Sequence, residues 1–484
     1  MSFNFRTIIH ILGMLLFFNG LFMFMCLPWA FIYHEPWAYL VLSGSITVAM
    51  GFILFQFGKK TQNKELKKKD GYLIVTLGWL TMSLFGTIPY LLSGGIPDFT
   101  NAFFETISGF TTTGASILND IESLPKALLF WRSLTQWIGG MGIIVLAVAI
   151  LPLLGIGGMQ LFVAEAPGIT PDKLKPRIKD TAKRLWLLYL FLTLSECLLL
   201  WFGGMSFFDA INHALTTMAT GGFSTKQDSI AHWNSPFIHY VIVVFMFLAG
   251  TNFTITYFAL KGKLKKVIGN EEFRNYLKLT LIATLFGAVY IFFSTWDHPE
   301  KSFRESLFQV VSIITTTGYI TADYTAWTPV LTTLFFLLMF LGGSAGSTAG
   351  GIKIVRHTLL YKNSLLEIKR QLHPSAVLPV RLNHKAINPA IMHNVLAFIM
   401  LYLSVFCIGL ILMSMTGVSF DTAIGAVATS LGNIGPGLGS VGPVDNFSHI
   451  SPFGKWLLSF LMLLGRLELF TVLMLFYPGY WRKV

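Results

Sequence analysis

Residues 305–321 read ESLFQVVSIITTTGYIT, an apolar run that ends in three threonines and a glycine. Three other segments have the same form: NAFFETISGFTTTGAS (101–116), DAINHALTTMATGGFST (209–225) and DTAIGAVATSLGNIGPGL (421–438). Each begins at Asn, Asp or Glu and reaches a glycine 13 or 14 positions later, at Gly114, Gly222, Gly318 and Gly435. The first residue predicts a helix N-cap. About ten residues then predict a helix roughly 15 Å long, half the depth of a membrane.

The composition of the chain indicates a membrane protein. Of its 484 residues 54% are hydrophobic and only 12% are charged, half the charged fraction of a soluble domain. Apolar blocks of 18 or more residues predict membrane-spanning helices. We expect ten, at 8–33, 37–57, 72–93, 127–153, 184–204, 236–260, 276–294, 328–356, 393–415 and 453–477. The first block is too long for a signal-peptide core and is expected to be retained.

Charge alternates between the connections that join these blocks. Lysine and arginine fill the connections at 59–69, 173–184, 261–278 and 356–385, and acidic residues lie in the connections between them. Because cytoplasmic loops carry the excess of Lys and Arg, both termini are expected in the cytoplasm and the four short helices on the outer side. This topology explains the net charge of +12, so nucleic-acid binding is not expected.

Each short helix lies between two spanning helices, so one unit occurs four times. The unit is helix, half-helix, re-entrant loop, helix. The sequence therefore predicts an all-α polytopic membrane protein with four pseudo-symmetric repeats around one pore. We expect an N-terminal hairpin at 1–58, pore repeats at 70–154, 184–260, 275–357 and 393–484, and cytoplasmic linkers at 155–183 and 358–392.

The loops that follow the short helices suit a cation filter. Irregular backbone at membrane depth is tolerated only where it is buried in protein or lines a cavity. A stretched loop can direct carbonyl oxygens at a pore axis, and glycine allows backbone conformations closed to other residues. One TTTG could be an ordinary threonine-rich turn, but four matched copies favour a K+ filter. Its expected residues are Thr111, Thr112, Thr113, Gly114, Ala219, Thr220, Gly221, Gly222, Thr315, Thr316, Thr317, Gly318, Gly432, Asn433, Ile434 and Gly435.

The four loops are not identical. The second reads ATGGF and has no threonine triplet, and the fourth has lost its threonines. Tetrameric potassium channels carry two glycines in each filter loop, whereas the four loops here share only one. We therefore expect weaker discrimination against sodium than in such a channel.

The spanning helix after each loop carries features expected of a gate. Glycines recur there at Gly139, Gly140, Gly250 and Gly465. In the third repeat ten small residues, GGSAGSTAGG (342–351), have too little helix propensity for a regular helix. A helix–helix contact is the alternative, but we favour an unwound loop that crosses the pore. Its residues are Gly342, Gly343, Ser344, Ala345, Gly346, Ser347, Thr348, Ala349, Gly350 and Gly351.

Arg466 is expected to complete this gate, because it lies within the last apolar block. An arginine there usually faces a watery cavity or a partner. Glu468 is two positions away and would point to another side of a helix, so a salt bridge between the two is not favoured. A positive charge below the filter would raise the barrier to cations.

These motifs together resemble the TrkH family, the potassium-translocating subunits of bacterial Trk systems within the Trk/Ktr/HKT superfamily. The resemblance rests on the fourfold Thr-Gly pattern, GSAGSTAGG (343–351), LGRLE (464–468) and WIGGMGIIVLAVAILPLLGIGGMQLF (137–162), and includes the N-terminal hairpin. It implies potassium uptake across the bacterial inner membrane through a gated, channel-like pore, with K+ as the transported ion and no organic cofactor on this chain. By this likeness the four loop glycines are filter glycines, 342–351 is the gating loop and Arg466 is a constriction arginine.

The same resemblance implies partners. It implies a homodimer with one pore per protomer, and a cytosolic TrkA-like nucleotide-binding ring that carries ATP or NAD. The basic segments 155–183, 261–278 and 357–390 would face this ring or anionic lipid.

Two other classes of function, a coupled symporter and an enzyme, fit these residues less well than a channel. A symporter that couples potassium to protons or sodium would place titratable groups in its spans, yet apart from Arg466, Glu468 and Glu196 the apolar blocks carry almost none. His213 lies in a short helix and is expected to be a packed histidine. An enzyme is not expected, because the sequence has no clustered His, Cys and carboxylate set and no phosphate loop.

Overall fold

The computed structural model describes residues 3–58, 68–145, 174–296 and 298–482. Among these residues the only strands are the two-residue β1 (Arg381–Leu382) and β2 (Lys385–Ala386), which pair with each other. Within the described ranges six helices are long and apolar enough to cross a membrane, or eight if two sharply bent pairs each form one span. The chain therefore has the expected all-α polytopic membrane fold, although ten continuous spans are not seen.

Some expected segments lie wholly or partly outside the described residues. These are most of the basic connection 59–69, the end of the block 127–153 and most of the linker 155–183. The last part of that linker is helical, because α10 begins at Leu174.

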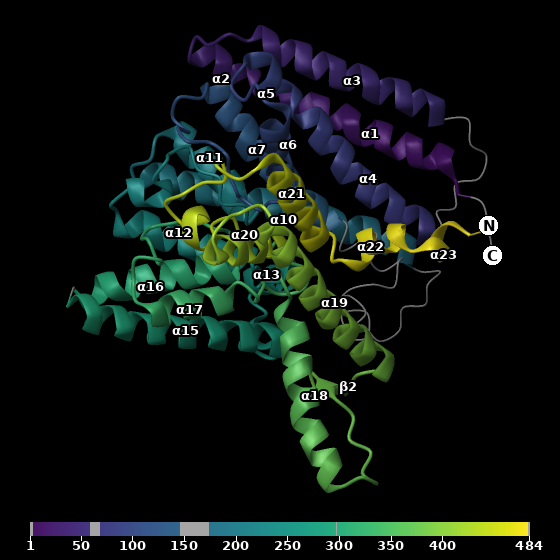
Figure 1. Cartoon of the computed structure of the whole chain (residues 1–484), viewed down its shortest axis with the longest axis vertical. Helices are drawn as coiled ribbons and strands as arrows, with labels where there is room; N and C mark the ends of the chain where they lie inside the picture. Colours follow the sequence, from purple (N-terminus) through teal and green to yellow (C-terminus); the bar gives the residue numbers. More distant parts are fainter. Residues whose placement is uncertain (1–2, 59–67, 146–173, 297, 483–484) are drawn as a thin grey trace.

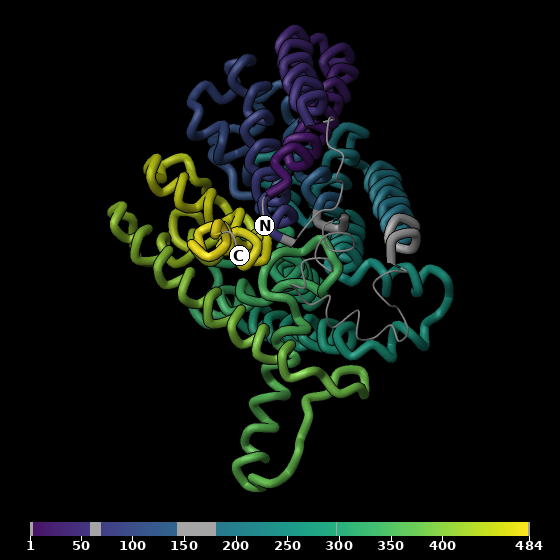
Figure 2. Tube along the Cα trace, turned by 90° about the vertical axis from the view of Figure 1, so that its right-hand side faces the viewer, coloured from purple at the N-terminus to yellow at the C-terminus, as the bar shows by residue number. Residues whose placement is uncertain are grey.

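The N-terminal hairpin pairs α1 (Phe5–Phe24) with α3 (Ala38–Gly58), and α2 (Leu27–Ile32) joins them. Glycines bring the two backbones together. A Cβ on Gly13 would lie 2.8 Å from the carbonyl oxygen of Gly51, and one on Gly51 would lie 2.9 Å from that of Gly13. Small residues allow this approach between membrane helices. Figures 1 and 2 both show the hairpin at one end of the molecule.

Four short helices carry the repeated segments, and they are α6 (Phe99–Phe110), α11 (Phe207–Met218), α16 (Pro299–Ile314) and α20 (Phe420–Gly432). The expected N-caps at Asn101, Asp209, Glu305 and Asp421 are wrong, because the helices begin one to six residues earlier. Asp98, Ser206 and Ser419 cap three of them through their side chains. Each of these caps lies 16 positions before its glycine (114−98, 222−206, 435−419). In the third repeat the N-cap residue His298 lies 20 positions before Gly318 (318−298), so α16 is longer by one turn.

The remaining helices flank the short ones. In chain order they are α4 (Lys68–Gly86), α5 (Ile88–Ser93), α7 (Lys126–Val145), α10 (Leu174–Phe202), η3 (Ser229–His232), α12 (Pro236–Ala249), α13 (Phe253–Leu260), α14 (Leu264–Ile268), α15 (Glu271–Thr295), α17 (Pro329–Leu338), α18 (Ile354–Leu372), α19 (Pro389–Ser414), η4 (Gly439–Val441), α21 (Pro452–Arg466), α22 (Phe470–Phe476) and α23 (Pro478–Trp481).

Two expected spans are broken rather than continuous. In 236–260 the chain bends by 116° between α12 and α13, and in 453–477 it bends by 119° between α21 and α22. At the first break Asn252 caps a new helix by accepting a hydrogen bond from the Thr254 amide. At the second, Glu468 and Leu469 both adopt a left-handed backbone, with φ of 57° and 52°. This conformation is uncommon for residues other than glycine and cannot continue a helix.

The expected span 328–356 is also not one helix. α17 ends at Leu338 and α18 begins at Ile354, so residues 339–353 form a loop, as expected for 342–351. α18 then continues to Leu372 and projects from the body, with the return segment that carries β1 and β2 beside it (Figures 1 and 2). The segment expected as the linker 358–392 is therefore an ordered arm.

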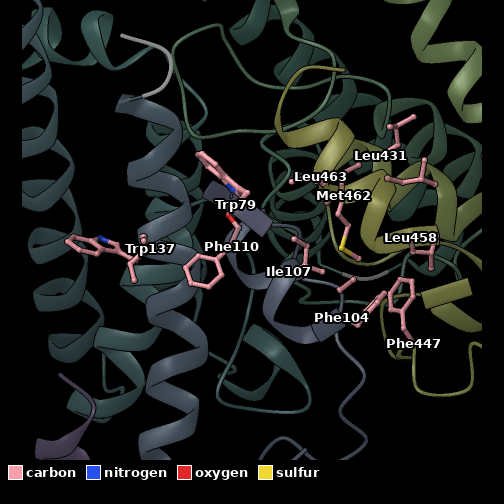
Figure 3. Packing of buried hydrophobic residues seen from close by; sticks show 14 of the residues in the cluster. Trp79, Phe104, Ile107, Phe110, Trp137, Leu431, Phe447, Leu458, Met462 and Leu463 are labelled. Carbon is pink, nitrogen blue, oxygen red and sulfur yellow. Dashed lines mark hydrogen bonds between the residues drawn. The ribbon is translucent and has the colours of Figure 1, made fainter. Parts of the chain in front are cut away.

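Large buried side chains hold the short helices in the core. Phe104 of α6 lies beside Phe447, with 5.5 Å between ring centroids, and Trp79 donates a hydrogen bond to the Phe110 carbonyl at 3.2 Å. Figure 3 shows Trp79 and Phe110 near α7, which carries Trp137, and Phe104 and Phe447 near Leu458 of α21. The rings of Phe3 and Trp481 are 5.3 Å apart, so both ends of the chain lie together.

Candidate functional site

The four loops share one backbone conformation. In each, the glycine and the residue two positions before it are left-handed: Thr112 and Gly114, Thr220 and Gly222, Thr316 and Gly318, Asn433 and Gly435. The glycines were expected from the sequence, but the left-handed threonines were not. Threonine is branched at Cβ and rarely adopts positive φ, and such strain costs of order 1–3 kcal/mol per residue. Strain of this kind clusters at functional sites and ligand clamps.

The loops also close into a ring. A Cβ on Gly114, Gly222, Gly318 or Gly435 would lie closer than 3.0 Å to the carbonyl oxygen of the residue before the glycine of the next repeat. In order these oxygens belong to Gly221, Thr317, Ile434 and Thr113. Real Cβ atoms essentially never come so near, so only glycine fits at these four positions. The structure thus brings the expected filter residues of all four repeats together, in the order one, two, three, four.

A cavity of about 80 Å³ lies beside this ring, and we call it the mouth. All four loop glycines line it, together with Arg132, Lys226 and Asp445. Lys226 pairs with Glu122 at 2.8 Å, and this hydrogen bond holds the pKa of the Glu122 carboxyl below its usual range. The mouth therefore carries fixed charges of both signs.

Polar side chains support the ring from behind. Gln136 of α7 donates a hydrogen bond to the Gly221 carbonyl at 2.6 Å and accepts one from the Phe223 amide at 3.1 Å. Asn433 donates to the Thr113 hydroxyl at 3.0 Å, which links the fourth loop to the first. Sequence reasoning missed Gln136. Its one signal in the sequence was a polar amide within the apolar block 127–153.

The loop at 342–351 lies against the ring and the helix ends around it. The Gly350 amide donates to the Thr316 hydroxyl at 2.6 Å. The Thr348 hydroxyl donates to the Met218 carbonyl at 3.0 Å, at the end of α11. Arg466 donates to the Thr348 carbonyl at 2.7 Å and to the Gly139 carbonyl at 3.3 Å. The loop therefore contacts all four repeats, directly or through Arg466.

Further bonds hold the two ends of this loop. The Ala345 amide donates to the Glu272 carboxylate at 2.7 Å, and Asn252 donates to the Ala345 carbonyl at 2.6 Å. At the other end the Lys353 ammonium donates to the Ala349 carbonyl. Because these partners belong to α13, α15 and the start of α18, movement of those helices would act on the loop.

The glycines of the spanning helices allow close packing. A Cβ on Gly139, Gly140, Gly250 or Gly465 would lie closer than 3.0 Å to an atom of Phe110, Ala219, Thr315 or Leu431, respectively. Each of those four residues lies within one position of the C-terminal end of a short helix. These glycines therefore allow the spanning helices to approach the ends of the short helices closely.

A buried ion pair lies below the loop. Glu468 pairs with Arg356 of α18 at 2.5 Å, and the Arg356 guanidinium lies 4.0 Å from the centroid of the Phe398 ring. Arg466 makes no ion pair with Glu468, as expected from their spacing. The Arg356–Glu468 pair, 112 residues apart, could not be expected from the sequence. It joins the break after α21 to the helix that follows the loop.

Replacing Glu468 with glutamine is expected to destabilise the protein. The change leaves the Arg356 charge buried and uncompensated, and such losses cost about 3–5 kcal/mol. The melting temperature in detergent should fall by more than about 5 °C. Glu367→Gln is the control, because its pair with Arg370 is exposed and contributes about 0–1 kcal/mol. Equal melting temperatures for the two variants would contradict the role given to the buried pair.

The chain is similar to known transport proteins over almost its whole length. The family model described as "TrkH: Cation transport protein" matches residues 43–287 and 297–483. The Trk system potassium uptake protein TrkH of Salmonella typhimurium is 41% identical over 489 residues, which cover 99% of this chain and all of that protein. The Escherichia coli protein of the same name is 42% identical over 492 residues, with the same coverage. The Escherichia coli protein named TrkG is 35% identical over 485 residues, covering 99% of both chains.

The fold also matches a solved structure. The crystal structure of the potassium transporter TrkH from Vibrio parahaemolyticus superposes with a TM-score of 0.91 and 38% sequence identity. The match covers both chains completely. The family model, the full-length relatives and the fold agree, and the chain belongs to the TrkH family of cation transport proteins.

Proposed function

We propose that this chain carries potassium ions across the bacterial inner membrane through a gated, channel-like pore, with both termini in the cytoplasm. The observation that carries the proposal is the ring in which the loops of four repeats meet through backbone carbonyl oxygens. Such oxygens can replace the hydration shell of a cation. Full-length relatives named as potassium uptake proteins support K+ as the ion. The mixed composition of the four loops supports moderate selectivity over Na+.

The loop at 342–351 and Arg466 form the proposed gate. The loop lies against Thr316 of the ring, and Arg466 places a buried positive charge beside it. A cation that leaves the ring on this side would meet both. Opening requires the loop to break its bonds to Arg466 and to the ends of α11 and α12.

The projecting arm supports regulation from the cytoplasm. α18 begins directly after the loop, and Arg356 fixes its first turn to Glu468. A cytosolic TrkA-like nucleotide-binding ring that displaced α18 would therefore act on the loop. The basic segment 357–390 lies on this arm, and the basic segment 261–278 lies on α14 and the start of α15. We also propose that the chain acts as a homodimer.

One observation favours coupled transport as a second candidate. Glu196 of α10 is fully buried, and within the described part of the chain neither carboxylate oxygen has a hydrogen-bond partner. The Thr217 hydroxyl, on the facing short helix, donates to the His213 carbonyl instead. Unpaired acids within membrane helices often mark proton relays. A potassium–proton symporter would give Glu196 a role that a channel does not require.

Electrical recording of the purified protein in planar bilayers separates the two candidates. A channel should give a single-channel current that is linear in voltage and reverses at the Nernst potential of K+. With equal K+ on both sides, a gradient of one pH unit should drive no current. A symporter would instead reverse at a potential that depends on both gradients. Loss of that pH dependence in Glu196→Gln would then assign the proton to this carboxyl and overturn the channel.

A further inference from the structure

One position recurs behind the ring. Nine residues before each loop glycine the short helices carry Glu105, His213, Gln309 and Ala426 (114−105, 222−213, 318−309, 435−426). All four side chains are buried. The three polar ones each bond to the chain that leaves the ring in the same repeat. We call them the braces.

The first brace is the most extensive. The Glu105 carboxylate accepts hydrogen bonds from the Ser116 hydroxyl and the Ile117 amide, each at 3.0 Å. It also pairs with Arg132 at 2.6 Å, and both side chains are almost completely buried. Arg132 donates in turn to the Ser224 carbonyl at 2.9 Å. One ion pair therefore ties together the ends of the first and second loops.

The second and third braces are uncharged. His213 hydrogen-bonds through Nε2 to the Ser224 hydroxyl at 3.0 Å, two residues after the glycine, as Glu105 does to Ser116. Gln309 donates to the Thr321 hydroxyl at 3.3 Å and to the Ala322 carbonyl at 3.2 Å. Three different side chains at the same helix position thus bond to the chain two to four residues after the loop glycine.

The fourth repeat has no such side chain. Ala426 carries no polar group, and the chain after Gly435 packs directly on α20. A Cβ on Gly425 would lie closer than 3.0 Å to the backbone of Leu438, and Tyr324 donates to the Gly437 carbonyl at 2.9 Å. Backbone contact, together with a hydrogen bond that the Ser440 amide donates to the Thr422 hydroxyl of α20 at 3.1 Å, holds this quarter where the others use a brace.

We infer that Glu105, His213 and Gln309 are positioning residues that set the cation selectivity of the ring by holding the outer ends of three loops at a fixed spacing. This inference rests on the proposed function. Discrimination between similar ions depends on the size of the site or on the number and orientation of its carbonyls. On the size account the loops must not relax around a smaller ion, and on the carbonyl account the braces fix how many carbonyls face the ion and where they point. A site of this kind depends on the shell that supports it.

Gln309→Leu tests the inference without leaving a buried charge. The side chains are close in volume, and the change removes two hydrogen bonds, each worth about 0.5–1.5 kcal/mol. The K+/Na+ permeability ratio, from reversal potentials under bi-ionic conditions, should fall about threefold or more. The K+ flux per protein should stay within about twofold of wild type, because the ring keeps all its oxygens.

Glu105→Gln should have a larger effect, of about tenfold on the same ratio, because it also removes a charged bond. Thr106→Val is the matched control. Thr106 is the next residue on α6, equally buried, and among the described residues its hydroxyl bonds only to the Ala102 carbonyl of its own helix. Its permeability ratio should be that of wild type.

The outcomes separate this inference from the proposed function. If Gly222→Ala loses K+ uptake while Gln309→Leu and Glu105→Gln keep the wild-type ratio, the braces do not set selectivity and the filter stands. Equal losses of K+ and Na+ flux at an unchanged ratio would show a merely structural role and also overturn the inference. If Gly222→Ala itself keeps wild-type uptake and ratio, the proposed filter is wrong and the inference falls with it.

Discussion

Replacing Arg466 with alanine is expected to raise cation flux by about tenfold or more, the effect of lowering a barrier by roughly 1.4 kcal/mol. The change has two consequences. It removes the donor that holds the Thr348 carbonyl at 2.7 Å, which frees the loop from α21. It also removes a buried positive charge from the proposed pathway, where low dielectric strengthens its repulsion of K+. Tracer uptake of ⁸⁶Rb+ into proteoliposomes at equal protein content measures the result.

Arg466→Lys separates these two consequences. Lysine keeps the charge, but its single ammonium cannot reproduce the planar guanidinium that reaches both Thr348 and Gly139. If charge sets the barrier, the lysine variant should stay near wild type while the alanine variant rises. If the hydrogen bonds set it, both should rise. Unchanged or lower uptake by Arg466→Ala would contradict the gate.

Gly222→Ala is expected to reduce K+ uptake by at least about tenfold. The new Cβ would meet the carbonyl oxygen of Thr317, an oxygen of the ring, at a distance real Cβ atoms do not reach. The backbone φ of 76° adds strain of about 1 kcal/mol for alanine. Because neighbouring loops contact each other around the ring, the displacement should spread to the third loop. Complementation of a potassium-uptake-deficient strain at low K+ and ⁸⁶Rb+ uptake both measure the loss.

Gly204→Ala is the matched control for this change. Gly204 also has positive φ, 104°, but a Cβ there would meet nothing within 4 Å. The two variants share backbone strain and differ in whether they touch the ring. Wild-type uptake by Gly204→Ala and loss by Gly222→Ala would assign the effect to the ring. Comparable losses of uptake in both variants would show that backbone strain alone causes the effect.

The sequence predicted the repeated elements because their signals are local. Short helices that end three or four residues before a loop glycine follow from the repeated spacing, and the unwound segment 342–351 follows from ten consecutive small residues. The N-caps were missed because several polar residues precede each helix, and spacing alone could not choose among them. Asp98, Ser206 and Ser419 are selected by side-chain bonds to the first turn. The breaks after Ala249 and Arg466 were missed because both occur inside apolar blocks.

The sequence by itself determined the membrane character of this protein, its four short helices and the glycines on which its loops turn. Apolar blocks, helix propensity and positive φ are properties of a few neighbouring residues, so they can be recognised along the chain. Only the tertiary structure decided that the loops close in order around one ring, that Arg466 reaches Thr348 and that Arg356 pairs with Glu468. These contacts join residues 95 or more positions apart, and their partners are chosen by how the four repeats pack against one another.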